Sequence, residues 1–280
     1  MKVAIVVLLS ALALTSALDW KNINTLNINK AVPRILIPKN PNTRIVNGEE
    51  VEPHSIPWQV GLLIQMKNTE GTAFCGGSII SNQWILTAAH CVETAESIEV
   101  VLGAHKIKEE EDTQIRVVTT EFLHHEDWSR FTLTNDIALV KLPEPVEFND
   151  NIQSIGLPSD IGNIDDLTVS VTGWGKDSDE ATSVSEVLRI ISVPVMPNDK
   201  CNNFYFGIIQ DTHMCTDSWA GSIGTGHSTC SGDSGGPLVL EGTTQVGIVS
   251  FGIAFGCELG YPAAFTRVSS YVDWINAHIA

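Results

Sequence analysis

Positive charge is scarce in this sequence. Its 280 residues include 16 Lys and Arg against 33 Asp and Glu, a formal net charge of −17. Proteins that bind nucleic acids or anionic membranes gain much of their affinity from clustered basic side chains. The composition therefore argues against nucleic-acid and membrane partners.

Long apolar runs are also scarce, with one exception at the N terminus. Residues 1–17, "MKVAIVVLLSALALTSA", combine one lysine, an apolar stretch and small residues at the end, which is the layout of a secretory signal peptide. No other stretch reaches the ~20 apolar residues that a transmembrane helix requires. We therefore expect a soluble protein that is secreted into an extracellular space such as the gut lumen.

The sequence has no CxxC motif and no histidine pair at ligand spacing, so a zinc site has little support. Six cysteines all follow residue 17, and an even number in an oxidising compartment suggests three disulfides. Spacing alone leaves about 15 pairings open. The cysteines are Cys75, Cys91, Cys201, Cys215, Cys230 and Cys257.

No internal repeat is present either. Between about residues 44 and 265 the chain consists of short β-prone runs such as "IRVVTTEFL", "DIALVKL", "LTVSVTGW" and "TQVGIVSF", broken by Gly, Pro, Asp and Asn. This pattern predicts an all-β sandwich or barrel pair rather than βαβ units. Residues 157–167 are the best candidate link between two halves. In "YVDWINAHIA" the spacing of Val272, Ile275 and Ile279 predicts a terminal helix.

The run "STCSGDSGGPLV", residues 228–239, places Ser234 among several glycines. One interpretation is a tight turn. The other is a serine nucleophile on a turn whose backbone N–H groups bind a developing oxyanion. For the motif alone the two interpretations are about equal, and the second requires a base elsewhere in the chain.

His90 in "WILTAAHCV" and Asp136 in "LTNDIALVKL" are the candidates for a base and its orienting carboxylate. Acyl transfer needs an imidazole that a buried carboxylate holds in one tautomer. Asp136 precedes an apolar run, where a carboxylate is costly without a hydrogen-bond partner. Taken alone, His90 would more often be a structural histidine, and Asp136 would more often be an aspartate at a turn or at the start of a strand.

Taken together, "LTAAHC", "NDIAL" and "GDSGGP", in that order, resemble the chymotrypsin-like serine peptidases. The resemblance covers residues 45–280 and includes "RIVNG", "PWQVGL", "FCGGSII" and "VTGWG". It implies two six-stranded antiparallel β-barrels, about residues 45–156 and 157–267, with the catalytic cleft between them and a C-terminal helix at 268–279. It also implies that Ser234 attacks the substrate, His90 transfers the proton and Asp136 orients His90. The backbone N–H groups of Gly232 and Ser234 would form the oxyanion hole.

The family resemblance further implies activation by cleavage after Arg44, in "NTRIVNG", by a trypsin-like protease. The new α-amino group of Ile45 would then pair with Asp233. Residues 18–44 would be a propeptide, and since they contain no cysteine we expect their release. This propeptide holds five basic residues and one acidic residue, whereas residues 45–280 hold 10 basic and 32 acidic residues. A basic propeptide that lies on an acidic surface would slow or steer activation, and a solvated propeptide without specific contacts is the alternative.

By the same resemblance Ser228 forms the floor of the specificity pocket, where trypsin-like members have an aspartate. An unpaired buried cation would be disfavoured there, so cleavage after Phe, Tyr, Leu or Met is expected, and elastase-like preference is the next alternative. Ser250 and Gly252 would pair with the substrate, and Ala263 would make the pocket shallower. "VVLGAH" and "SFGIAFGCELGYPAAFTRV" resemble the arthropod brachyurins. In that group an aspartate at the position of Ala263 broadens specificity, so the alanine here argues against broad or collagenolytic cleavage, which is kept as a further alternative.

The resemblance implies the disulfides Cys75–Cys91, Cys201–Cys215 and Cys230–Cys257. No cofactor or metal is expected, because "GAHKIKEEEDTQ" has Ala104 where related calcium loops have their first ligand. Expected partners are protein or peptide substrates, the activating protease and protein inhibitors, and the enzyme is expected to be a monomer. A non-catalytic binding homologue is the alternative from another class, and the presence of all three triad residues argues against it.

Overall fold

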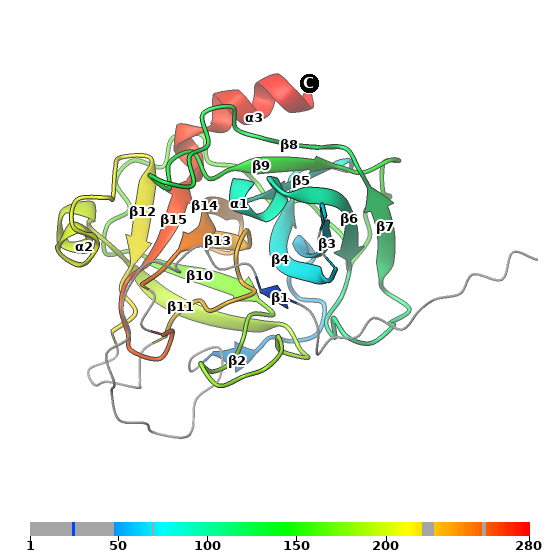
Figure 1. Ribbon diagram of the computed structural model, residues 1–280, viewed down its shortest axis with the longest axis horizontal. Helices are drawn as coiled ribbons and strands as arrows, with labels where there is room; N and C mark the ends of the chain where they lie inside the picture. Colours follow the sequence, from blue (N-terminus) through cyan, green and yellow to red (C-terminus); the bar gives the residue numbers. More distant parts are fainter. Residues whose placement is uncertain (1–23, 26–47, 69, 220–226, 254–255) are drawn as a thin grey trace, which may run out of the picture.

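The computed structural model describes residues 48–68, 70–219, 227–253 and 256–280, together with the backbone of residues 24 and 25. The predicted signal peptide and the predicted cleavage site at Arg44 and Ile45 lie outside the described residues. Two β-sheets make up most of the molecule, and the C-terminal helix lies across one end (Figure 1). No described helix is both long enough and apolar enough to cross a bilayer.

The first sheet has the strand order β7-β6-β3-β4-β5-β9-β8. Only two residues separate β7 from β8, which stand at opposite ends of this order. Together they act as one bent strand, so the sheet corresponds to the predicted six-stranded barrel. A short strand, β1 (Asn24–Thr25), adds to β4. The other strands are β3 (Gln59–Met66), β4 (Thr72–Ile79), β5 (Trp84–Thr87), β6 (Ala95–Leu102), β7 (Ile115–Thr119), β8 (Phe122–His124) and β9 (Ala138–Lys141).

The second sheet is a closed barrel in which β10 pairs with both β13 and β11. Its order is β10-β13-β14-β15-β12-β11, and β2 (Glu49–Glu50) adds outside β11. The runs predicted as strands form β7 with β8, β9, β10 and β14, as expected. The strands are β10 (Thr168–Gly173), β11 (Arg189–Met196), β12 (His213–Thr216), β13 (Pro237–Leu240), β14 (Thr244–Phe251) and β15 (Ala263–Arg267).

Strand β3 shows how the two barrels come to face each other. Its alternate side chains point to opposite sides of the sheet. Leu62 and Ile64 lie in the core of the first barrel, whereas Leu63 packs with Trp174 and Leu188 from the second half of the chain. Burial of both faces explains why this strand is apolar almost throughout. The interface between the barrels is therefore an apolar layer in its own right.

The predicted domain boundaries differ from the structure at both ends. Strand β2 belongs to the first segment in sequence but pairs with β11 of the second sheet. At the C terminus, a 3₁₀ turn at Val268–Ser270 comes first, and α3 (Val272–Ile279) follows it. Ile275 of α3 packs in the core of the first barrel although the helix follows the second. Strand β2, near the start of the peptidase segment, thus contacts the second barrel, and α3, at its end, contacts the first. Both contacts help to hold the two barrels together.

Candidate active site

His90 lies in α1 (Ala89–Val92), a single helical turn that directly follows β5. The apolar strand ends in two small alanines, which lets this turn pack inside the molecule, and all four of its residues are buried. The neighbouring Cys91 forms a disulfide with Cys75 on β4. The position of His90 is therefore fixed by the chain on both sides.

Asp136 contacts His90 through both of its carboxylate oxygens. Oδ2 lies 2.8 Å from His90 Nδ1, and Oδ1 accepts the backbone N–H of His90 at 2.9 Å. An ionised carboxylate can only accept, so the ring proton sits on Nδ1 and the lone pair on Nε2. This is the tautomer that a general base needs at Nε2.

The second barrel completes the surroundings of Asp136. Ser250 Oγ donates to Asp136 Oδ2, and Thr266 Oγ1 donates to the backbone carbonyl of Asp136 at 2.7 Å. Complete burial of Asp136 by itself raises the pKa of the carboxyl group, but electrostatic attraction to His90 and the hydrogen bonds from His90 and Ser250 outweigh it. The pKa of Asp136 therefore lies below its ordinary value, and the group is a carboxylate.

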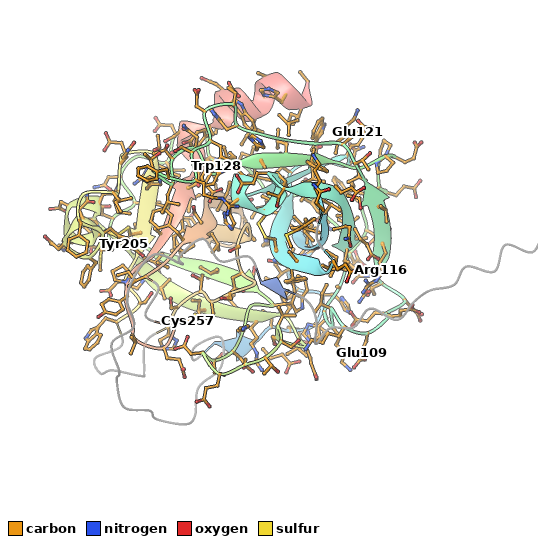
Figure 2. The ribbon with its side chains drawn as sticks, viewed as in Figure 1. Glu109, Arg116, Glu121, Trp128, Tyr205 and Cys257 are labelled. Atoms are coloured by element: carbon orange, nitrogen blue, oxygen red, sulfur yellow. A yellow bond between two sulfur atoms is a disulfide. The ribbon has the colours of Figure 1, made fainter. Side chains whose placement is uncertain are left out.

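A surface contact ties the chain before Asp136 to the helix of His90. Trp128 Nε1 donates to Glu93 Oε2 at 2.9 Å, and Glu93 is the residue that caps α1. Arg130 also pairs with the Glu93 carboxylate. Trp128 lies beside α1 in Figure 2. Both members of the His90–Asp136 pair are thus held from outside as well as from the core.

Ser234 lies on the turn that precedes β13. Gly232 has φ +106° and Gly235 has φ +78°, backbone conformations that favour glycine. A side chain at Gly235 would collide with Thr87 and with the backbone of Gly76. Ser234 also accepts the N–H of Gly76 through its carbonyl at 2.7 Å. The turn of Ser234 is therefore packed directly on the end of the strand that leads into His90.

Two backbone donors at this turn remain available. Among the described residues, neither the N–H of Gly232 nor that of Ser234 has a protein acceptor. Within the same part of the chain, Ser234 Oγ makes no hydrogen bond to His90 Nε2. Such catalytic hydrogen bonds are often long before substrate binds. The arrangement can supply a hydroxyl nucleophile, a base and two oxyanion donors.

Asp233 is buried, and its carboxylate points away from Ser234 toward the segment around Trp174. It accepts the N–H of Gly175 at 2.8 Å and that of Cys230 at 2.9 Å. Burial raises the pKa of Asp233 to about 6, although these two hydrogen bonds oppose the shift. No cation pairs with it among the described residues. A buried carboxylate in this state would bind a positive charge strongly.

The residues predicted to form the pocket lie around β14 and β15. Ser228 is buried, and its Oγ donates to the carbonyl of Thr229 at 3.2 Å. A side chain at Gly252 would meet no atom of the described residues within 4 Å. Ala263 is buried on β15 opposite Thr216. Residues 220–226 and 254–255, which neighbour this region in sequence, lie outside the described residues.

The structure contains the three disulfides that the family resemblance implied: Cys75–Cys91, Cys201–Cys215 and Cys230–Cys257. The described residues include two sets of three potential metal-binding side chains within 4.8 Å, and each set contains two disulfide-bonded cysteines. Metals bind thiolate sulfur, and a disulfide offers none. In the acidic loop 103–114, Glu111 Oε2 instead accepts donors from His105, Lys106 and Gln114.

Several contacts at the site escaped the sequence analysis. Thr266, Glu93 and Trp128 carry no motif, and their partners lie 35 to 130 residues away. His213, on β12, is another: its Nε2 lies 2.8 Å from the Leu133 carbonyl in the loop before Asp136. The only sequence signal for these residues is that each is a polar residue close to an apolar run.

The trypsin family model matches residues 45–275. The chain belongs to the trypsin family. Brachyurin from Leptuca pugilator is 49% identical over 233 residues, which cover 83% of this chain and 97% of the relative. Chymotrypsin from Phaedon cochleariae is 39% identical over 288 residues, 99% of this chain and 98% of the relative. The solved structure of HL collagenase matches with a TM-score of 0.74 at 39% identity, covering 84% of this chain and 99% of that one. As a member of this family the chain is a serine endopeptidase that acts on proteins.

Proposed function

We propose that this protein is a secreted digestive endopeptidase, made as an inactive zymogen, that cleaves after large apolar residues. The observation that carries the catalytic assignment is the doubly bonded pair of His90 and Asp136, packed against the turn of Ser234. Secretion into a compartment such as the gut lumen rests on the leader at residues 1–17.

In the proposed mechanism Ser234 Oγ attacks the scissile carbonyl while His90 Nε2 takes its proton. Asp136 stabilises the imidazolium that forms, and the N–H groups of Gly232 and Ser234 bind the oxyanion. His90 then protonates the leaving amine, and the acyl-enzyme remains on Ser234. Water activated by His90 releases the acid and restores the serine.

The zymogen proposal rests on Asp233. A buried carboxylate with a raised pKa, adjacent to the nucleophile, opposes the negative charge that forms in the transition state. The α-amino group of Ile45, freed by a trypsin-like protease after Arg44, would neutralise Asp233. Chymotrypsin from Phaedon cochleariae matches 99% of this chain, so that relative has counterparts of residues before 45.

The specificity proposal rests on Ser228 and Gly252. An uncharged pocket floor disfavours Lys and Arg. No described atom would lie within 4 Å of a side chain at Gly252, which supports room for large substrate side chains. Elastase-like preference for small residues is the alternative, because Ala263 makes the pocket shallower. The 39% identity with HL collagenase keeps broad collagenolytic cleavage as a second candidate. We also propose that the enzyme is a monomer. Protein inhibitors would block it by binding in the same cleft as the substrate.

A peptide-library digest with the recombinant zymogen, before and after brief trypsin treatment, tests this function. We expect activity only after cleavage at Arg44, with preference for Phe, Tyr, Leu or Met, and none in the Ser234→Ala variant. Cleavage after Lys or Arg would overturn the pocket assignment. Cleavage of native collagen by the same sample would favour the collagenolytic alternative. A folded, correctly cleaved protein with no activity would instead indicate a binding homologue.

A further inference from the structure

Strand β4 has a free edge beside the nucleophile. On one side β4 pairs with β3 along residues 72–78. On the other side it pairs with β5 only at Ser78 and Ile79. Within the described chain, residues 72–77 thus have no barrel strand on that side. An edge of this kind is a template for another extended segment.

Strand β1 occupies this edge. It lies parallel to β4, with Asn24 opposite Ala73 and Thr25 opposite Phe74, and is visible beside β4 in Figure 1. Because β3 already fills the opposite edge, β1 can pair only on the free one. Asn24 and Thr25 precede the proposed cleavage site at Arg44, so a piece of the propeptide is the occupant.

The edge leads directly to Ser234. The N–H of Gly76 donates to the Ser234 carbonyl at 2.7 Å, and the carbonyl of Gly76 accepts Thr87 Oγ1 at 2.8 Å. Both backbone groups of Gly76 therefore point away from β3. Phe74 lies two residues earlier and presents its backbone groups on the same edge, about 7 Å along the strand. Strand β1 thus pairs with β4 one such step before the residue that contacts the Ser234 carbonyl.

Length and charge both allow β1 to stay in place after activation. Thr25 precedes Ile45 by 20 residues, which span up to about 70 Å when extended. Insertion of Ile45 therefore does not pull β1 away. The propeptide carries five basic residues and one acidic residue, against 10 basic and 32 acidic residues in the peptidase segment. This attraction would help to retain a cleaved propeptide.

We propose that the propeptide segment around Asn24 and Thr25 is an intramolecular inhibitor that adds a strand to the free edge of β4 beside Ser234. The proposal rests on the peptidase function proposed above. Ser250 and Gly252 are assigned to the part of the substrate before the scissile bond. The edge at Phe74 would therefore bind the part after the scissile bond, which leaves with the amine. Cleavage after Arg44 then leaves a bound strand that must dissociate before long substrates enter. We therefore expect slow, salt-dependent release of the propeptide, rather than the immediate release expected from its lack of cysteine.

The test adds synthetic peptides of residues 18–44 to the activated full-length enzyme after removal of its own propeptide by gel filtration at about 1 M salt. Three peptides are compared: the natural sequence, Asn24→Pro and, as a control of equal charge, Asn29→Pro. In the parallel register Thr25 lies opposite Phe74 with its N–H pointing away from β4, so the N–H of Asn24 is the one that faces the edge. Proline removes a backbone donor from the strand. Two substrates are used, an unfolded polypeptide and a short peptide anilide that has no residues beyond the scissile bond.

We expect the natural and Asn29→Pro peptides to slow polypeptide cleavage at least about tenfold more than anilide cleavage, and Asn24→Pro to bind at least about tenfold more weakly. Equal inhibition by all three peptides would show that inhibition depends only on the charge of the peptide, and would contradict the proposed strand pairing with β4. Absence of inhibition would overturn it as well. An enzyme inactive on both substrates would refute the proposed function instead. In that case hydrogen exchange of the Phe74 amide would decide whether the strand forms. The natural peptide should slow this exchange if it pairs with β4, and should leave it unchanged if it does not.

Discussion

Asp136 accepts two hydrogen bonds from His90, one from ring Nδ1 at 2.8 Å and one from the backbone N–H at 2.9 Å. The first bond sets the tautomer of the imidazole, and the second anchors the helical turn that carries it. A single carboxylate thus fixes both the chemistry and the position of the base. Neither bond would survive a small shift of the loop that precedes Asp136.

Replacement of this carboxylate is therefore the sharpest test of the pair. In Asp136→Asn, the amide can donate to His90 Nδ1, which forces the ring proton onto Nε2 and removes the base. The corresponding change in the best-studied triad of this family lowers kcat by about 10⁴, and we expect a similar loss here. Steady-state kinetics of the activated variant, with circular dichroism to verify folding, measures it. A loss below about tenfold would contradict the proposed role of Asp136.

The pKa of Asp233 predicts how the zymogen responds to pH. Burial raises this pKa to about 6, above 3.8 for the exposed group, so the folded zymogen binds the proton more tightly than the unfolded chain. The contribution of this group to stability is then highest below about pH 4 and falls by about 3 kcal/mol as the pH rises to about 6. Urea unfolding of the Ser234→Ala zymogen measures this fall.

Adding Asp233→Asn to that zymogen should remove this part of the decline between pH 4 and 7, because the amide does not titrate. After cleavage at Arg44, however, the same substitution should abolish activation, since the ammonium of Ile45 loses its partner. If the free energy of unfolding had the same pH dependence in the Ser234→Ala zymogen with and without Asp233→Asn, Asp233 would not be the source of the decline.

Gly252 provides a test of specificity that leaves folding untouched. A side chain here would meet no atom of the described residues within 4 Å, so Gly252→Val should fold with its stability changed by less than about 0.5 kcal/mol. We expect kcat/KM for substrates with Phe or Tyr at the cleavage site to fall at least about tenfold, because the valine blocks the pocket mouth. Substrates with Ala at that site are the matched control. An equal loss for both would indicate a general defect rather than a pocket effect.

His213 is expected to stabilise the loop that carries Asp136. It is buried, its Nδ1 accepts the N–H of Gln210, and its Nε2 donates to the Leu133 carbonyl. Burial lowers the pKa of His213, which keeps the ring neutral as this geometry requires. His213→Ala should therefore lower the free energy of unfolding by about 2 kcal/mol and reduce kcat.

His213→Gln is the matched variant, because its amide can still donate to Leu133. It should retain more activity than His213→Ala, whereas His278→Ala, on the exposed terminal helix, should change neither quantity. Denaturant titration and kinetics of the three variants decide the question. Equal kcat values for the alanine and glutamine variants would argue against the contact with Leu133.

The strands could be predicted because short apolar runs and turn residues are local properties. Short runs of β-prone residues bounded by turn residues predicted β9, β10 and β14, and the three- to four-residue period predicted α3. The short 3₁₀ turn before α3 escaped prediction, since its residues carry no separate signal. The pairing of β2 with the second sheet escaped as well, because two glutamates contain no information about their partner strand.

For the site, the sequence by itself determined which residues are chemically suited to their proposed roles: a glycine-rich turn at Ser234, a histidine after an apolar strand and an aspartate before one. Only the tertiary structure decided that they meet. His90 and Asp136, 46 positions apart in the sequence, meet because β5 pairs with β9. Asp136 and Ser250, 114 positions apart, are brought together by burial of the apolar layer between the barrels. That burial is non-directional and depends on the whole chain, so no local pattern encodes the contacts it creates.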